Sequence, residues 1–206
     1  MDYDSQPDLE FNLRGIDLVI STISGTPQIN LIDAAAASNV RSFVPSEFEG
    51  PPDRRGRHDP LDRGKAAALE RLRHWTHKRN CTMRYTSFVC GVFYERFAPG
   101  GLASVDIGTS TGANYQGAYL MDIGNSTAEI VERNSSGRSV YVSMTSVNDV
   151  GRFLAAALDL GIQNWPTEFK MYGDRRKVSE ILQWAEATKG GLSRCLNTLL
   201  LSTDIK

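Results

Sequence analysis

The chain has 206 residues, a formal net charge of −1 and three cysteines. A charge this close to zero argues against nucleic-acid binding through a basic surface. No apolar run approaches the ~18 residues that cross a bilayer, and the acidic opening MDYDSQPDLE is not a signal peptide. Three scattered cysteines form neither a disulfide framework nor a zinc site. We therefore expect a cytoplasmic protein with no metal and no membrane or nucleic-acid partner.

The early part of the sequence predicts a strand, a helix and a second strand. The apolar run Ile16–Ile20 is typical of a strand buried on both faces. Thr26 offers a hydroxyl for an N-cap and Pro27 suits the first helical position, and apolar residues then recur at helical spacing as far as Asn39. Val40–Val44 is the second strand. Such a unit within ~30 residues implies a right-handed parallel crossover, so the fold class is α/β.

The alternation of strands and helices continues beyond this unit. Residues 49–64 are rich in proline, glycine and charge, which indicates a loop directly after a strand, where functional residues concentrate. Lys65–Lys78 is predicted to be helical, and Thr82–Phe88 is predicted to be a strand. The sequence therefore predicts three parallel strands with two intervening helices.

After Pro99 the character of the sequence changes. Residues 101–127 are rich in glycine, serine and threonine, which predicts irregular structure or short strands. Ala128–Glu132 and Ser139–Met144 predict two paired strands around an intervening turn. The other predicted elements are a helix at Val150–Leu160 with Asp149 as its cap, a strand at Phe169–Tyr172 and a helix at Val178–Lys189.

Three segments carry a resemblance to a known family: GIDLVIS at 15–21, LIDAA at 31–35 and VRSFVPSEF at 40–48. They resemble the NmrA-like family, especially its isoflavone reductase-like branch, and the resemblance extends over most of residues 15–190. It implies a partial Rossmann-like parallel sheet flanked by helices, with a smaller C-terminal substrate lobe. The expected division is an NAD(P)-binding domain at 1–100, a substrate lobe at 101–190 with segments packing back on the Rossmann core, and an atypical tail at 191–206.

The sequence also departs from the family. The glycine-rich turn G-x-x-G-x-x-G, which cradles the dinucleotide pyrophosphate in family members, has no counterpart here. The first predicted strand resembles the family's fourth. We therefore expect a truncated chain that lacks roughly 60 to 80 N-terminal residues, the span of two βα units. In the family, that part also supplies the contacts to the adenosine ribose and the 2′-phosphate.

Lys65 is the candidate catalytic residue. In the reductase branch that this chain resembles, a lysine at the start of this helix lies near the nicotinamide ribose and the substrate carbonyl, where it orients the ribose or transfers a proton. The alternative is a solvated lysine in a first helical turn, a position that the helix dipole disfavours for a cation. The Tyr-x-x-x-Lys pair of short-chain dehydrogenases is absent, because Leu61 stands at the tyrosine position.

The resemblance also implies cofactor contacts from residues that follow the three strands. Besides Lys65, they are Ser21, Thr22 and Ile23 after the first strand, Pro45, Ser46, Glu47 and Phe48 after the second, and Cys90 and Phe93 after the third. The alternatives are an ordinary strand-to-helix turn for the first group, a place in the core for Phe48, and a buried apolar residue rather than a nucleophile for Cys90.

Charged residues in the 49–64 stretch leave two alternatives open. Arg54, Arg55 and Arg57 either attract a phosphate or belong to a solvated charged loop. His58 is a candidate for a mobile acid.

The function implied by the resemblance is an NAD(P)-dependent oxidoreductase that reduces a small aromatic or enone-type substrate. NADPH is the cofactor that the branch implies, and NAD remains open. The alternatives are a non-catalytic NAD(P)-sensing regulatory protein and an inactive fragment, since loss of the phosphate-binding turn removes much of the cofactor affinity.

Overall fold

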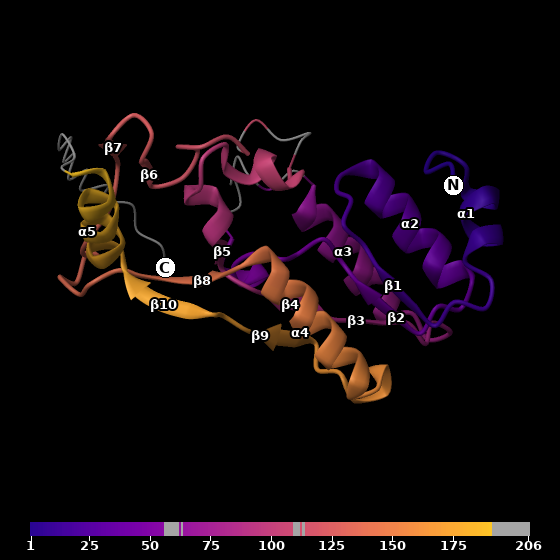
Figure 1. Ribbon diagram of the computed structural model, residues 1–206. Coiled ribbons are helices and arrows are strands. Elements are labelled where there is room, and N and C mark those ends of the chain that lie inside the picture. The colour runs from indigo at the N-terminus through magenta and orange to yellow at the C-terminus, as the bar shows by residue number, and fades with distance from the viewer. Residues whose placement is uncertain (56–61, 63, 109–111, 113, 191–206) are drawn as a thin grey trace. The chain divides into compact units, whose positions relative to one another are not determined.

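The computed structural model describes residues 1–55, 62, 64–108, 112 and 114–190 (Figure 1). The helices in these ranges are α1 (Gln6–Asn12), α2 (Thr26–Ala37), α3 (Lys65–Thr76), α4 (Val147–Asp159) and α5 (Val178–Lys189). The strands are β1 (Leu18–Ile20), β2 (Ser42–Val44), β3 (Arg84–Tyr85), β4 (Ser87–Val89), β5 (Val92–Phe93), β6 (Met121–Asp122), β7 (Thr127–Ala128), β8 (Tyr141–Thr145), β9 (Glu168–Lys170) and β10 (Asp174–Lys177).

The chain forms two compact units that alternate along the sequence. The first unit comprises Met1–Cys90 and Gly151–Met171, and the second comprises Gly91–Val150 and the chain from Tyr172 onward. The functional division predicted at residues 100 and 190 stays a prediction. None of the helices in the described ranges is both long and apolar enough to cross a bilayer.

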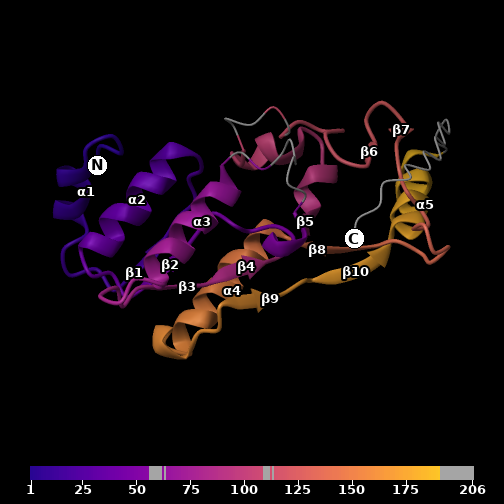
Figure 2. The ribbon, with the colours of Figure 1, turned by 180° about the vertical axis from the view of Figure 1, so that it is seen from behind.

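The first unit contains the parallel sheet that the sequence predicts. β1 pairs with β2 and β2 with β3, all parallel, in the order β1-β2-β3. α2 connects β1 to β2 and α3 connects β2 to β3, and both helices lie on the same side of the three strands (Figure 2). This arrangement confirms the α/β fold class, with a parallel sheet flanked by helices.

A single apolar core holds the helices onto this sheet. Leu31 and Ile32 of α2, Leu72 of α3 and Phe43 of β2 are all buried in it, and Leu9 joins it from α1. Fully burying side chains of this size contributes about 1.5–3 kcal/mol each relative to exposure. The apolar face predicted for α3 is confirmed at Leu69 and Leu72, whereas in α2 the buried face is centred on Leu31, Ile32, Ala34 and Ala35.

β1 and the start of α2 differ from their predictions. Ile20 is 38% exposed, so the expectation that this strand is buried on both faces is wrong for β1, which lies at the edge of the sheet. In β2, by contrast, all residues are buried. The hydroxyl cap predicted for α2 is also wrong, because Gly25 occupies the N-cap with no side-chain hydrogen bond.

The stretch predicted as one strand from Thr82 to Phe88 is two strands with different partners. β3 continues the β1-β2-β3 sheet, whereas β4 pairs in parallel with β9. Phe88 of β4 lies 5.1 Å from the ring of Phe169 and 5.7 Å from that of Trp165, measured between ring centroids. This aromatic cluster gives β4 a packing partner away from β2.

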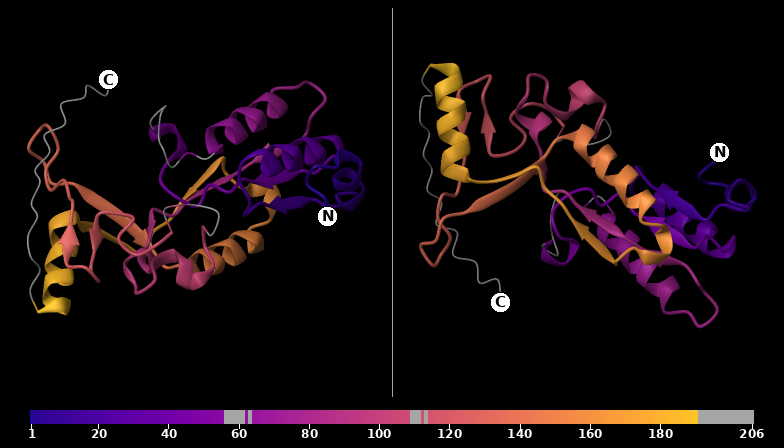
Figure 3. Two further views of the ribbon diagram at one scale, coloured as in Figure 1. Left: turned by 90° about the horizontal axis from the view of Figure 1, so that it is seen from above. Right: turned by 60° about the horizontal axis from the view of Figure 1, so that its bottom comes forward.

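The second unit has shorter and mixed strand pairing. β8 lies between β10, its antiparallel partner, and β5, its parallel partner. Figure 3 shows α5 following β10, and α5 packs on β10 with Val178 and Ile181 buried beside Met144 of β8. The predicted substrate-lobe region therefore has its own apolar core.

Two predictions in the second unit need correction. The predicted hairpin between 128–132 and 139–144 is confirmed only next to its turn, where an antiparallel bridge joins Arg133 to Ser139 and the N–H of Val140 donates to the carbonyl of Glu132 at 2.9 Å. The longer pairing is wrong, because β7 pairs with β6 and β8 pairs with β5 and β10. Asp149 is not the cap of α4. Its backbone N–H instead donates to Oγ of Ser146, at 3.2 Å, so the serine caps the helix.

Candidate functional site

The carboxyl ends of β1 and β2 lie side by side, and the predicted site residues follow them. The backbone N–H of Ser21 donates to the carbonyl of Val44 at 2.8 Å, which extends the parallel ladder by one residue. The Ser21 side chain is buried, and Ile23 packs against the core of the unit. Thr22 is exposed at this edge. Ligands of open α/β sheets bind at such edges.

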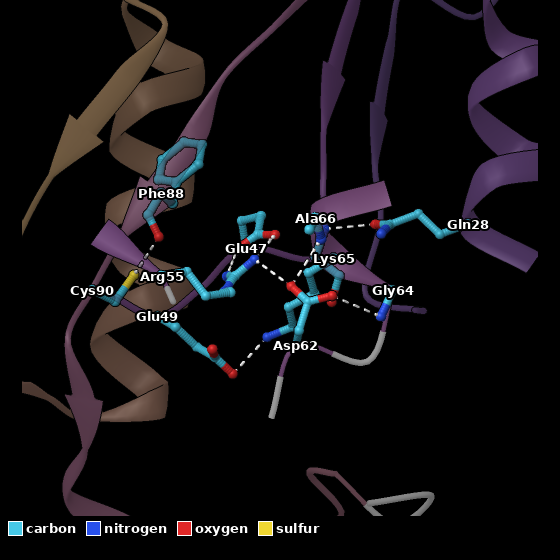
Figure 4. Close-up of polar contacts among 11 residues, drawn as sticks. Gln28, Glu47, Glu49, Arg55, Asp62, Gly64, Lys65, Ala66, Phe88 and Cys90 are labelled. Carbon is cyan, nitrogen blue, oxygen red and sulfur yellow. Dashed lines mark hydrogen bonds and ion pairs between the residues drawn. The ribbon is translucent and has the colours of Figure 1, made fainter. Parts of the chain in front are cut away.

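Lys65 is the first residue of α3 and is only 9% exposed. Its Nζ lies 2.5 Å from Oε1 of Glu49, which follows the second strand (Figure 4). The alternative of a solvated lysine in a first helical turn is therefore wrong. A catalytic role for Lys65 stays a prediction.

Asp62 holds the start of α3. Its backbone carbonyl accepts from the N–H of Lys65 at 2.9 Å, and its carboxylate accepts from the N–H groups of Ala66, at 3.0 Å, and Gly64, at 3.2 Å. Gly64 has a φ of +81°, and a Cβ there would lie 3.1 Å from Cα of Gly25. Glycine at this position therefore permits both the left-handed backbone and the close approach of the two helix starts.

Glu47 and Arg55 form a buried ion pair at the same place. Glu47 is 1% exposed, and both of its carboxylate oxygens accept from the Arg55 guanidinium, with Nη1 at 3.1 Å from Oε1. Nη1 of Arg55 also donates to Oδ1 of Asp62 at 3.2 Å. Burial alone would lower the pKa of Arg55, but its hydrogen bonds to Glu47 and the nearby carboxylates raise the pKa above its usual value.

This pair corrects the prediction for Arg55. The guanidinium neither belongs to a solvated loop nor stands free for a phosphate. Arg57, His58 and Leu61 lie outside the described residues, as does the tail 191–206.

Ser46 is held by a buried glutamine from α2. Its backbone N–H donates to Oε1 of Gln28 at 2.7 Å, and Pro45 beside it is buried. Nε2 of Gln28 has no hydrogen-bond partner in the described part of the chain. A buried donor of this kind marks a place where a water molecule or a ligand oxygen completes the structure.

The remaining predicted contacts are distributed over both units. Phe48 faces Phe88, with ring centroids 6.2 Å apart, so it takes part in packing. Burial raises the pKa of the Cys90 thiol to about 12, which favours the inert alternative over a nucleophile. The backbone N–H of Cys90 donates to the carbonyl of Glu49 at 2.9 Å. Phe93 lies on β5, in the second unit.

Ion pairs connect the charged side chains at this site. Among the described residues, the carboxylates of Glu47, Glu49 and Asp62 stand against the cations of Arg55 and Lys65. In the described ranges no three His, Cys, Asp or Glu side chains converge as a metal site.

Comparison with known proteins supports the class of fold. No protein-family model matches the chain. Oxidoreductase BOA1 from Botryotinia fuckeliana is 30% identical over 178 residues, which cover 84% of this chain and 51% of that protein. The chain therefore spans about half the length of this curated relative.

Solved structures with the same fold include proteins with bound NAD or NADP+. AtPrR2 with NADP+ and (+)pinoresinol matches with a TM-score of 0.62 at 18% identity, covering 93% of this chain and 58% of that one. Leucoanthocyanidin reductase from Vitis vinifera, in a ternary complex, matches with a TM-score of 0.61 at 18% identity, covering 92% and 60%. A short-chain dehydrogenase/reductase superfamily protein from Agrobacterium tumefaciens with bound NAD has a TM-score of 0.56 at 19% identity, covering 93% and 70%. The fold of this chain is accordingly Rossmann-like, as in these solved structures.

Proposed function

We propose that this chain is an NADPH-dependent reductase of the NmrA-like, isoflavone reductase-like type that acts on a small aromatic or enone-type substrate. The observation that carries the proposal is the position of Lys65, buried at the start of α3 beside the carboxyl ends of two parallel strands. The similarity to an oxidoreductase and to a reductase solved with NADP+ supports the reaction class and the cofactor.

The chain's own residues have distinct parts in this proposal. Ser21, Thr22 and Ile23 would contact the nicotinamide riboside from the end of β1, and Ser46 from the end of β2. When bound, the reduced cofactor supplies a hydride. Lys65 orients the ribose and holds the proton at Nζ that passes to the substrate oxygen. Glu49, which is half exposed, connects Nζ with solvent, from which the proton is replaced.

The test is NADPH oxidation by the purified chain with a panel of small aromatic enones. Lys65→Met is expected to lower kcat/KM by about 100-fold or more, the usual loss for a group that transfers a proton. Lys78→Met is the matched control, because Lys78 is an exposed lysine just after the same helix, with Nζ 3.7 Å from the Trp75 ring centroid. Equal turnover by wild type and Lys65→Met would contradict the catalytic role of Lys65.

A non-catalytic NAD(P) sensor is the second candidate function. The ion pair between Lys65 and Glu49 favours it, because a lysine engaged by a carboxylate also fits a purely structural role. In that case the chain binds NAD(P) without turnover, and Lys65→Met changes neither property. A chain that neither binds nor turns over a nicotinamide nucleotide would correspond to an inactive fragment.

A further inference from the structure

A path of three charged side chains connects β2 to α3. Glu47 lies just beyond the end of β2 and is buried. The Arg55 guanidinium engages both of its carboxylate oxygens and reaches Asp62 with one of the same nitrogens (Figure 4). Asp62 in turn accepts three backbone N–H groups at the start of α3. A buried strand end is thus joined to the first turn of the helix that begins with Lys65.

The chemistry of the path makes it rigid. A buried carboxylate that loses its cation is strongly destabilised, so Glu47 holds Arg55 in one place. A guanidinium is a planar fork that can engage one carboxylate with two nitrogens and still donate to a second acceptor, whereas an ammonium offers a single point of charge. The side chain of Arg55 is only 9% exposed, so this is not one of the loosely held pairs found on protein surfaces.

We infer that Arg55 is a positioning residue: it fixes the start of α3, and thereby Lys65, against the carboxyl end of β2. The part that concerns catalysis rests on the proposed function of Lys65. The mechanical link itself does not, because it depends only on contacts within the first unit.

Asp62→Asn is the most informative variant, since it removes the charge between Arg55 and the helix while leaving the buried pair with Glu47 in place. The two readouts on the 206-residue chain are amide hydrogen exchange across residues 64–68 and the rate at which an amine-acetylating reagent modifies Lys65, followed by mass spectrometry. Both rates are expected to rise about threefold to tenfold, the usual size of coupling between contacting groups. Arg55→Lys is expected to change both rates in the same direction.

Arg71→Lys is the matched control. Arg71 lies on the same helix and also makes a two-nitrogen contact with a carboxylate, at 2.5 Å from Nε to Oδ1 of Asp33 and 2.7 Å from Nη2 to Oδ2. Loss of this two-nitrogen contact in Arg71→Lys should leave acetylation of Lys65 and amide exchange across residues 64–68 unchanged. Circular dichroism establishes that each variant is folded, and if Arg55→Lys is not, Asp62→Asn decides the question alone.

The inference is overturned if Asp62→Asn leaves both rates within twofold of wild type, or if Arg71→Lys raises them equally.

Where the chain turns over NADPH, Asp62→Asn should also lower kcat by roughly tenfold with little change in the KM for NADPH, because misplacement of a reacting group acts mainly on the chemical step. Absence of turnover in the wild-type chain would remove the proposed function but not the labelling result, so the two failures are distinguishable.

Discussion

The buried ion pairs of the candidate site, in the first unit, differ from the ion pairs described in the second unit. In the first unit Glu47 and Arg55 are buried, paired through two nitrogens and connected to a helix start. In the second unit the pairs Arg176–Asp174 and Lys177–Glu180 lie largely at the surface, and Arg175 and Arg176 stack over the aromatic rings of Tyr141 and Trp184.

This contrast indicates which side chains are held in a single arrangement. Exposed ion pairs contribute about 0–1 kcal/mol and tolerate movement. Buried pairs carry a desolvation penalty, so they persist where one arrangement is strongly determined. The residues around Lys65 therefore belong to the part of the molecule with the more tightly fixed side chains, whereas β10 and its surroundings present a solvated surface.

The largest effect is expected from Arg55→Met. It leaves the Glu47 carboxylate buried without its cation, so the free energy of unfolding should fall by about 3–5 kcal/mol, measured by urea denaturation. Arg176→Met in the second unit is the control and should leave the free energy of unfolding nearly unchanged, because its ion pair lies at the surface. Replacing Glu47 and Arg55 together by methionine should recover much of the loss. Equal costs for the two arginines would break the contrast between the units.

Burial at the ends of the first unit's strands can be measured by thiol alkylation. Burial raises the pKa of Cys90 to about 12, whereas Cys81 is only partly buried. At pH 8 we expect alkylation of Cys90 to be at least ~100-fold slower than that of Cys81, because only the thiolate reacts and burial keeps Cys90 protonated. Since the folded-state pKa is raised, the stabilisation from a neutral Cys90 is present below about pH 9 and is lost as the pH rises toward 12. Similar rates at the two cysteines would mean that this strand end is open to solvent.

In the second unit the most sensitive backbone position is Gly91. It has a φ of +74°, and a Cβ there would lie 2.2 Å from the carbonyl oxygen of Ser143. Gly91→Ala should therefore lower the free energy of unfolding by about 2 kcal/mol or more, through backbone strain and the clash between β5 and β8. Gly137→Ala is the matched control: its φ is +73° with open space around it, so only the strain of about 1 kcal/mol applies. Indistinguishable stabilities of the two variants would disprove the close contact.

The smallest effect is expected at the link between α2 and α3. Burial acts to raise the pKa of Asp33, but the hydrogen bonds from Arg71 and Trp75 lower it by a larger amount. The pKa of Asp33 therefore lies below its usual value. Stabilisation from this carboxylate is therefore present above about pH 4 and is lost as the pH falls through the folded-state pKa. Asp33→Asn should cost about 1 kcal/mol at pH 7, since this partly exposed group is screened by solvent, and progressively less as the pH falls below about 4. A cost that does not depend on pH would point to packing rather than charge.

Elements with both a periodic apolar face and a marked end were predictable from the sequence. α5 has the predicted bounds, Val178–Lys189, because buried Ile181 and Ala185 define its face and Gly190 ends it in a left-handed conformation. Strands of only a few residues were not predictable from the sequence. β10 consists of Asp-Arg-Arg-Lys, whose composition does not favour a strand, and pairing with β8 overrides that preference.

The candidate site was predictable at its strand ends but not in its pairings. The sequence placed Lys65 at the start of a helix and Glu47 after a buried strand, and both positions are confirmed. It gave no means to choose Arg55 over Arg54 as the partner of Glu47, because that depends on the path of a loop. The burial of Glu47, which requires a cation nearby, is seen only in the structure.

Calorimetric titration of the 206-residue chain with NADPH and NADH tests the central proposal most directly, with Lys65→Met and Lys78→Met titrated beside it. We expect the wild-type chain to bind NADPH, Lys65→Met to bind it about tenfold more weakly through loss of a charged hydrogen bond, and Lys78→Met to bind it as wild type does. If neither nucleotide binds the wild-type chain, the assignment of this strand-end site to a nicotinamide cofactor is contradicted. If Lys65→Met binds NADPH unchanged, the contact between Lys65 and the cofactor is contradicted.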